Sequence, residues 1–133
     1  MNARPQAWLA QARSDLDLAQ LACRNGFLAQ ACYFASQAAE KALKSALLEL
    51  GLEAPPHTPV LGDLLQRLQV AGLDTAAFQT LPLKALSRMA ITSRYPIDAT
   101  PPAELFDRAE TEQAIAVAAA VIAAIEALDR QPG

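Results

Sequence analysis

The stretch from residue 27 to residue 50 constrains the fold more than any other part of this chain. It contains no proline, it is followed by Gly51, and most of its residues are good helix formers. Small and apolar residues recur along it at steps of three and four, the period of a helix face: Phe27, Ala31, Phe34, Ala38, Ala42 and Ser45. A second apolar line runs through Leu28, Cys32, Ala39, Leu43, Ala46 and Leu50. A helix that is apolar on most of its circumference must be covered on most sides, so we expect the central helix of a bundle.

A narrow polar stripe remains on this helix, formed by Tyr33, Gln37, Glu40, Lys41 and Lys44. Glu40 and Lys44 stand four residues apart in the favourable order, which stabilises a helix by only about 0.2–0.5 kcal/mol. The stripe therefore predicts either a face in water, which is the simpler interpretation, or part of a binding site.

The rest of the chain shows helical segments separated by glycine and proline. Helices are predicted over residues 5–24, 59–70, 82–92 and 102–128, with at most one helical turn between 74 and 81. Thr58 and Pro59 are expected as the N-cap and first-turn residues of the helix over 59–70. No alternating apolar run indicates a strand. We predict an all-α fold, an antiparallel up-and-down bundle of four main helices plus a short additional helix. We expect one domain over residues 1–133, with its core at about 5–128 and a frayed tail from Arg130 to Gly133.

Composition narrows the class of protein further. Apolar residues make up 53% of the chain and aromatic residues only 5%, so the core must consist mainly of alanine and leucine. The net charge of -3 gives no global sign of a polyanion partner, although a local basic patch can still bind one. Cys23 and Cys32 are expected as buried, reduced thiols.

Two observations bear on the cellular location. The N-terminal residues show no export signal. The longest strongly apolar run, at residues 114–128, is shorter than the roughly 20 residues that span a bilayer. We therefore expect a soluble, cytoplasmic protein that does not associate with membranes.

The last predicted helix carries two apolar lines, which exceeds what one small bundle needs. One runs through Phe106, Ala109, Gln113, Val117, Ala120, Ala124 and Leu128, and the other through Ala114, Ala118, Ile122 and Ile125. Burial within the monomer and the surface of a homodimer both account for this pattern, and the sequence leaves both open.

Motifs of familiar catalytic and cofactor sites are absent from the sequence. It has no Gly-rich phosphate loop, no GxSxG, no HExxH and no paired CxxC, and its single histidine precludes a His-rich metal site. We therefore expect neither a metal nor a cofactor. Two features remain besides the polar stripe. His57 lies in a proline-rich loop just before a predicted helix, a usual place for a structural or capping group. The segment from Ser93 to Asp98 has an arginine, Arg94, at a helix end, able to hold a phosphate or to bond helix-end carbonyls or Asp98.

These features in this order resemble the HEPN domain family (higher eukaryotes and prokaryotes nucleotide-binding). The resemblance covers the chain from about Trp8 to Leu128. Its most specific parts are the residues QAAEKALK from Gln37 to Lys44 and the Arg94-Tyr95-Pro96 segment.

The resemblance implies an antiparallel helical bundle that commonly dimerises. Many members of the family pair with a minimal nucleotidyltransferase, in some cases as toxin and antitoxin, and other members are metal-independent ribonucleases. The ribonuclease motif is an arginine followed after four to six residues by a histidine, for phosphate binding and proton transfer. Here Ala99, Thr100 and Pro101 occupy the positions expected for that histidine after Arg94.

The resemblance therefore predicts a binding module rather than an enzyme. It would pair with a nucleotidyltransferase or bind a nucleotide, and the expected site is Gln37, Lys41, Lys44, Arg94 and Tyr95. One alternative is a metal-independent ribonuclease that cleaves RNA with Arg94 and His57. Another is a non-catalytic dimeric scaffold whose polar stripe is only solvated.

Overall fold

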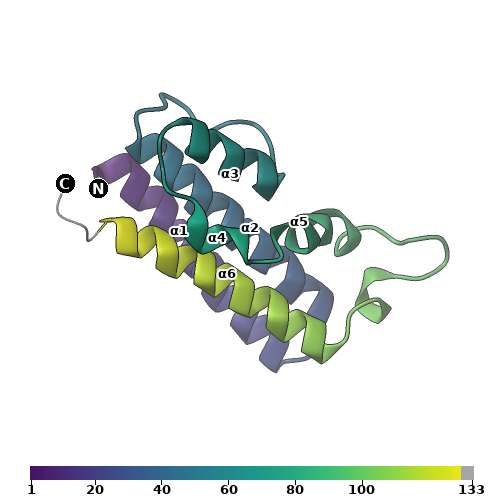
Figure 1. The fold of residues 1–133 in the computed structure, drawn as a ribbon. Helices are drawn as coiled ribbons and strands as arrows, with labels where there is room; N and C mark the ends of the chain where they lie inside the picture. The colour runs from purple at the N-terminus through teal and green to yellow at the C-terminus, as the bar shows by residue number, and fades with distance from the viewer. Residues whose placement is uncertain (130–133) are drawn as a thin grey trace.

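A computed structural model describes residues 1–129 of the chain, and within that range it is all-helical, as predicted. Figure 1 shows the long helices packed side by side, with the shorter helices across one face, and the N-terminus lies at the same end of the molecule as residue 129. The expectation for the tail Arg130 to Gly133 lies outside the described residues. The elements are α1 (Ala3–Arg24), α2 (Leu28–Glu49), α3 (Leu61–Val70), α4 (Ala76–Gln79), α5 (Leu83–Thr92), the 3₁₀ turn η1 (Pro102–Glu104) and α6 (Arg108–Asp129).

Helix α2 is the centre of the bundle, as its sequence predicts. It packs against α1, α3, α5 and α6. The surface that it presents to them consists largely of alanine, and these side chains are inaccessible to solvent: Ala31, Ala35, Ala38, Ala39 and Ala42. Because alanine adds little bulk, the neighbouring helices approach closely, while leucines from α2, α3 and α5 fill the larger spaces.

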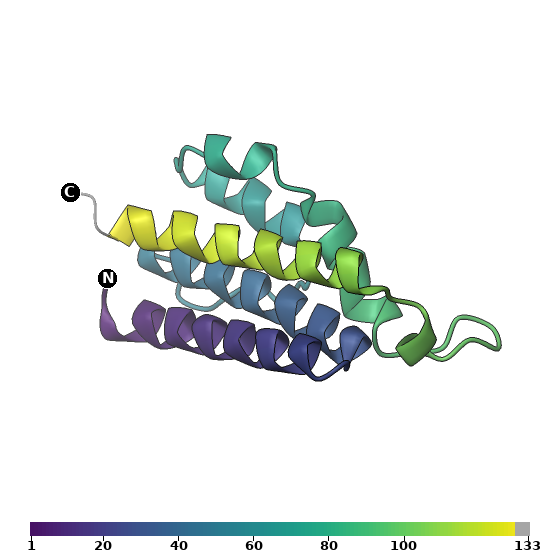
Figure 2. The ribbon, with the colours of Figure 1, turned by 90° about the horizontal axis from the view of Figure 1, so that it is seen from below.

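The turn between α1 and α2 has the hydrogen-bond pattern of a Schellman motif. Gly26, at φ +84°, adopts the left-handed conformation that ends α1. The backbone N–H of Phe27 donates to the Ala22 carbonyl (2.9 Å) and that of Gly26 to the Cys23 carbonyl (3.1 Å). This compact stop places α2 antiparallel to α1, and Figure 2 shows the two helices side by side over their length.

Helix α6 starts six residues later than the sequence analysis predicts. The chain from Pro102 forms only the 3₁₀ turn, and the α-helix begins at Arg108. The reason is a capping box at Asp107 and Glu110. The Asp107 carboxylate accepts the Glu110 backbone N–H (2.7 Å), and the Glu110 carboxylate accepts the Asp107 backbone N–H (2.8 Å).

The start of α3 is displaced in the same direction. This helix begins at Leu61, and Val60 occupies the cap position that was predicted for Thr58. The Thr58 hydroxyl accepts the backbone N–H of Val60 (3.2 Å) and therefore stabilises the turn before the helix. The Leu61 N–H is satisfied from outside the helix, by the Ser87 hydroxyl of α5 (2.8 Å).

The bundle buries one of the two apolar lines of α6 and covers the other only in part. Ala114, Ala118, Ile122 and Ile125 are buried against the core. The other line is only partly covered, with Val117 buried, Ala109 and Gln113 exposed, and the remainder intermediate. By length and composition alone, α6 is apolar enough to cross a membrane. Its packing against α1 and α2 accounts for the apolar character of the buried line.

Both cysteines are free and buried, as expected. The Cys32 thiol lies against the Thr111 hydroxyl of α6 (3.5 Å), and burial raises the pKa of this thiol. The Arg108 guanidinium donates to the Cys23 backbone carbonyl (2.9 Å) and thereby satisfies the C-terminal end of α1.

Candidate functional site

The end of α5 presents Arg94 in a defined geometry. Ser93 caps the helix, and the backbone N–H groups of Arg94 and Tyr95 both donate to the Ile91 carbonyl (3.1 and 3.3 Å). Pro96 then prevents any further helical turn. The Arg94 Nε donates to the Ala90 carbonyl (2.8 Å), which ties the guanidinium to the last turn of α5. Bonding of a helix-end carbonyl, one of the roles expected for this arginine, is therefore observed.

Two aromatic rings flank the same guanidinium. The Arg94 Cζ lies 5.0 Å from the ring centroid of Tyr33 on α2 and 5.2 Å from that of Tyr95. Both distances fall within the range of a cation–π interaction. Tyr33 is itself held by Phe34, edge to face, with the ring centroids 5.2 Å apart. Arg94 thus joins the loop after α5 to one end of the polar stripe on α2.

The outer edge of the guanidinium faces no protein carboxylate. Within residues 1–129, the terminal nitrogens of Arg94 make neither a hydrogen bond nor an ion pair, and Asp98 does not contact them. Arg94 is exposed, and Tyr95 is 56% exposed. A planar guanidinium with two unpaired terminal nitrogens binds a phosphate or carboxylate bidentately, and the rings beside it offer stacking surfaces.

The loop that follows extends away from the bundle, to the right of α5 in Figure 1. Residues 94–99 are exposed, and Asp98 adopts a left-handed backbone conformation (φ +58°). Ile97 and Thr100 pair across the turn in an isolated β-bridge. Tyr95 therefore stands, exposed, at the base of a projecting loop.

The other half of the stripe is arranged differently. The Lys41 Nζ forms an ion pair with the Asp15 carboxylate of α1 at 2.5 Å, with the two side chains 25% and 7% exposed. The Lys44 Nζ pairs with Glu40 at 3.2 Å, with the two side chains 10% and 13% exposed. A stripe in water therefore does not describe Glu40 and Lys44, whose side chains are largely covered, while Lys41 is half-buried and ion-paired.

The remaining predicted residues, Gln37 and His57, lie apart from these contacts. Gln37 is half-buried on α2, one turn from both Tyr33 and Lys41. His57 is exposed in the loop between α2 and α3. No hydrogen bond connects His57 with Arg94 in the part of the chain that the structure describes. A ribonuclease that uses this pair stays a prediction.

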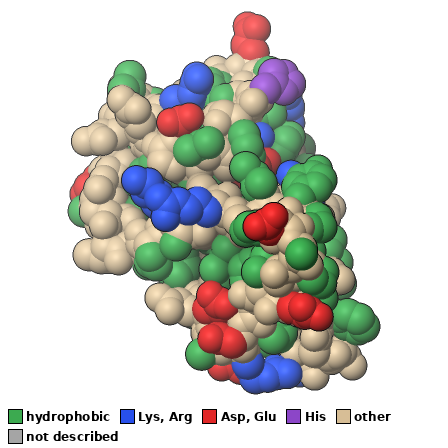
Figure 3. Space-filling model, turned by 90° about the vertical axis from the view of Figure 1, so that its right-hand side faces the viewer, with side chains coloured by type: hydrophobic (Ala, Val, Ile, Leu, Met, Phe, Trp, Pro, Cys, Tyr) green, Lys and Arg blue, Asp and Glu red, His purple; other side chains and the backbone are tan. Residues whose placement is uncertain are grey.

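Figure 3 shows the end of the molecule that carries the α5–α6 loop. Acidic, basic and apolar side chains are interspersed there, and no continuous basic surface forms on this face. This face therefore offers no broad positive field around the loop. Among residues 1–129, no three histidine, cysteine, aspartate or glutamate side chains gather in a way that could hold a metal ion.

Comparisons with known proteins agree with this architecture. The profile of the HEPN domain matches residues 5–128. This chain belongs to the HEPN domain family. A crystal structure of TT1696 from Thermus thermophilus is similar, at 34% identity and a TM-score of 0.78, covering 96% of this chain and 98% of that one. An archaeal HEPN homologue, ST0689, is similar at 25% identity and a TM-score of 0.76, with the same coverage. No curated protein matches significantly.

Two residues that make these contacts are not among the predicted site residues. Tyr33 belongs to the polar stripe, and Asp15 lies on α1. The available signal for Asp15 was its position three residues after Ala12 and four before Ala19, on the inner face of α1. A carboxylate on a buried helix face requires a cation from a neighbouring helix, and α2 supplies Lys41.

Proposed function

We propose that this HEPN domain binds the phosphate of a nucleotide at Arg94. The observation that carries the proposal is the arginine itself, which is flanked by Tyr33 and Tyr95, fixed to the Ala90 carbonyl and unpaired at its terminal nitrogens. A cation that already had a carboxylate partner would have to exchange it for the ligand. Arg94 has no such partner among the described residues, so phosphate binding does not break an ion pair.

The neighbouring groups support a nucleotide rather than a bare anion. Tyr95 is exposed and Tyr33 is half-buried, so part of each ring remains able to stack on a base. Gln37, one turn further along α2, offers both an amide donor and an acceptor to a base edge or ribose. Lys41 and Lys44 lie beyond it on the same stripe and contribute positive charge that Asp15 and Glu40 offset.

Calorimetric titration of mono-, di- and triphosphates of adenosine and guanosine tests this proposal. Arg94→Ala is expected to abolish measurable binding while the helical circular dichroism stays unchanged. Arg88→Ala is the matched control, because Arg88 is an exposed arginine on α5, six residues before Arg94, with no cation–π contact within residues 1–129. Equal affinities for the wild type, Arg94→Ala and Arg88→Ala would remove Arg94 from the site.

We further propose that the protein pairs with a minimal nucleotidyltransferase in a two-component, toxin–antitoxin-like system in the cytoplasm. Membership of the HEPN family and the exposed Tyr95 side chain at the base of a projecting loop support this pairing. Affinity purification from the native host with intact-mass spectrometry tests it. A co-purifying nucleotidyltransferase is expected, together with an added nucleotidyl mass that Tyr95→Phe eliminates. Recovery of the unmodified protein alone would contradict the pairing.

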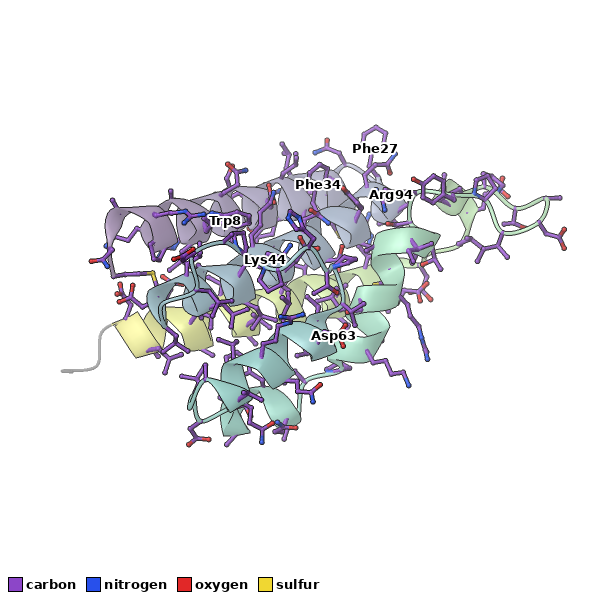
Figure 4. The ribbon with its side chains drawn as sticks, turned by 90° about the horizontal axis from the view of Figure 1, so that it is seen from above. Trp8, Phe27, Phe34, Lys44, Asp63 and Arg94 are labelled. Carbon is purple, nitrogen blue, oxygen red and sulfur yellow. The ribbon has the colours of Figure 1, made fainter. Side chains whose placement is uncertain are left out.

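We propose a homodimer as well, and the exposed apolar side chains indicate where. Three of the exposed large ones, Leu18, Leu21 and Phe27, border a hollow of about 400 Å³ beside the α1–α2 turn, together with Phe34. Figure 4 shows Phe27, Phe34 and Arg94 at the same end of the bundle. Phe27→Glu is expected to give a monomer mass in solution scattering at micromolar concentration. Ile91→Glu, on the exposed face of α5, is the control. A wild-type monomer would contradict the proposal.

A further inference from the structure

A second hollow lies between α1 and α2, away from Arg94. It measures about 240 Å³ and is lined by Ala7, Trp8 and Gln11 of α1 and by Lys41 of α2. Trp8 is half-buried, and its indole N–H makes no hydrogen bond within residues 1–129. The surface of the hollow is almost entirely apolar, with the indole among its walls and only a small polar edge at Gln11 and Lys41.

The polar edge of this hollow is electrically balanced. Lys41 and Asp15 form an ion pair, and the Gln11 Nε2 donates to the second oxygen of the same carboxylate (3.0 Å). An ammonium group has three N–H donors, of which Asp15 accepts one, and the Gln11 carbonyl oxygen is an unused acceptor. Because the ammonium charge is already neutralised, the hollow does not favour a phosphate. It suits a neutral, planar group with a largely apolar face, such as a nucleobase, whose edge meets the small polar rim.

The two sites lie along one line. Figure 4 shows Trp8, Phe34 and Arg94 in a row along the α1–α2 face. Eight residues of α2 separate Tyr33, beside Arg94, from Lys41, beside Trp8, which corresponds to about 12 Å along the helix axis. At about 3.4 Å for each step of a stacked strand, that distance spans three to four nucleotides.

We propose that the Trp8 hollow is a nucleobase subsite, which accepts one base of a single-stranded oligonucleotide whose phosphate lies on Arg94. The base stacks on the indole, and its polar edge meets Lys41 and Gln11. This inference rests on the proposed phosphate binding at Arg94 and extends it from a mononucleotide to a short strand. Aromatic platforms alternating with a backbone-binding cation are the physical basis of single-strand binding.

Trp8 is also the reporter for the test, because it is the only tryptophan of the chain. Its fluorescence is followed during titration with hexa-adenylate, AMP and a base-free polyphosphate, while anisotropy of a dye-labelled hexa-adenylate measures affinity separately. We expect saturable quenching by hexa-adenylate and none by polyphosphate. Trp8→Ala should weaken hexa-adenylate binding about tenfold, as expected for the loss of one stacked base.

A second variant fills the hollow without removing the reporter. Ala7 is exposed on α1, so Ala7→Leu adds a side chain to the hollow and leaves the core and the helix propensity nearly unchanged. We expect this variant to lose the quenching and about tenfold in affinity. Ala10→Leu, at another exposed position of α1 that does not line the hollow, should behave like the wild type.

The outcomes separate this inference from the function on which it rests. Binding of hexa-adenylate that depends on Arg94, without quenching and with unchanged affinity in Trp8→Ala and Ala7→Leu, overturns the subsite alone. Quenching by AMP as strong as that by hexa-adenylate, with equal affinity, overturns the oligonucleotide assignment. Absence of binding by every probe overturns the subsite and the phosphate site together.

Discussion

At one end of the polar stripe on α2, Lys41 and Lys44 face carboxylates. At the other end, Tyr33 faces the guanidinium of Arg94, which faces two rings and a carbonyl. All three cations were predicted as parts of one binding site. In the structure the two lysines form ion pairs with carboxylates within the bundle, whereas Arg94 has no carboxylate partner among residues 1–129. A cation near a predicted site is therefore informative only when its partners are known.

Mutation of the Lys41–Asp15 ion pair should have the largest effect on the free energy of unfolding. Lys41→Met leaves the buried Asp15 carboxylate without its cation. We therefore expect the free energy of unfolding to fall by about 3 kcal/mol. Urea denaturation measures this change. The double variant Asp15→Asn with Lys41→Met should recover much of the loss, because no buried charge remains. A Lys41→Met variant as stable as the wild type would show that the pair contributes nothing.

Mutation of Arg94, which stacks between two aromatic rings, should change nucleotide affinity and leave the free energy of unfolding nearly unchanged. Arg94→Lys is expected to weaken nucleotide binding by about 2 kcal/mol, because an ammonium cannot form the bidentate contact and also bond the Ala90 carbonyl. The free energy of unfolding should change by less than about 0.5 kcal/mol, as for other exposed positions. Calorimetry and urea denaturation on one preparation measure both quantities. Full binding by Arg94→Lys would show that the charge alone suffices.

Lys44 provides an intermediate case. Its partner Glu40 stands on the same helix and is 13% exposed, so Lys44→Met should cost about 1.5 kcal/mol, less than Lys41→Met. The cost should persist at high salt, because ions screen covered pairs weakly. Denaturation at low and high ionic strength measures it. A cost that disappears in salt would indicate that the pair behaves as a solvated one.

Ser93 should give the smallest effect. Its hydroxyl is buried beside Arg94 without a hydrogen-bond partner among residues 1–129. Ser93→Ala removes the unsatisfied group, and we expect a gain in stability of up to about 1 kcal/mol with unchanged nucleotide binding. Thermal denaturation with and without nucleotide measures both. A loss of ligand-induced stabilisation would show instead that the bound nucleotide uses this hydroxyl.

The structure agrees best with the sequence-based prediction where local patterns are strong. The helical period of residues 27–50, the Gly26 stop and the prolines at 55, 56, 82 and 96 led to the correct fold class and to most helix bounds. The start of α6 was wrong because the preceding prolines outweighed the Asp107–Glu110 capping box, which was readable in the sequence.

Several features of the candidate site were beyond prediction from one sequence. Nothing local indicates that Asp15 of α1 meets Lys41, or that Arg94 lies between rings from α2 and from its own loop. These contacts join residues separated by 26 and 61 positions (41 − 15 and 94 − 33). They depend on how the helices rotate and approach one another.

The sequence by itself determined that this protein is a helical bundle around residues 27–50, because helical periodicity and helix-ending residues act over a few positions. It also identified the arginine that ends α5. Only the tertiary structure decided which cations are offset and which is not. The energy of a charge depends on the groups within a few ångströms of it, and packing brings those groups from distant parts of the chain.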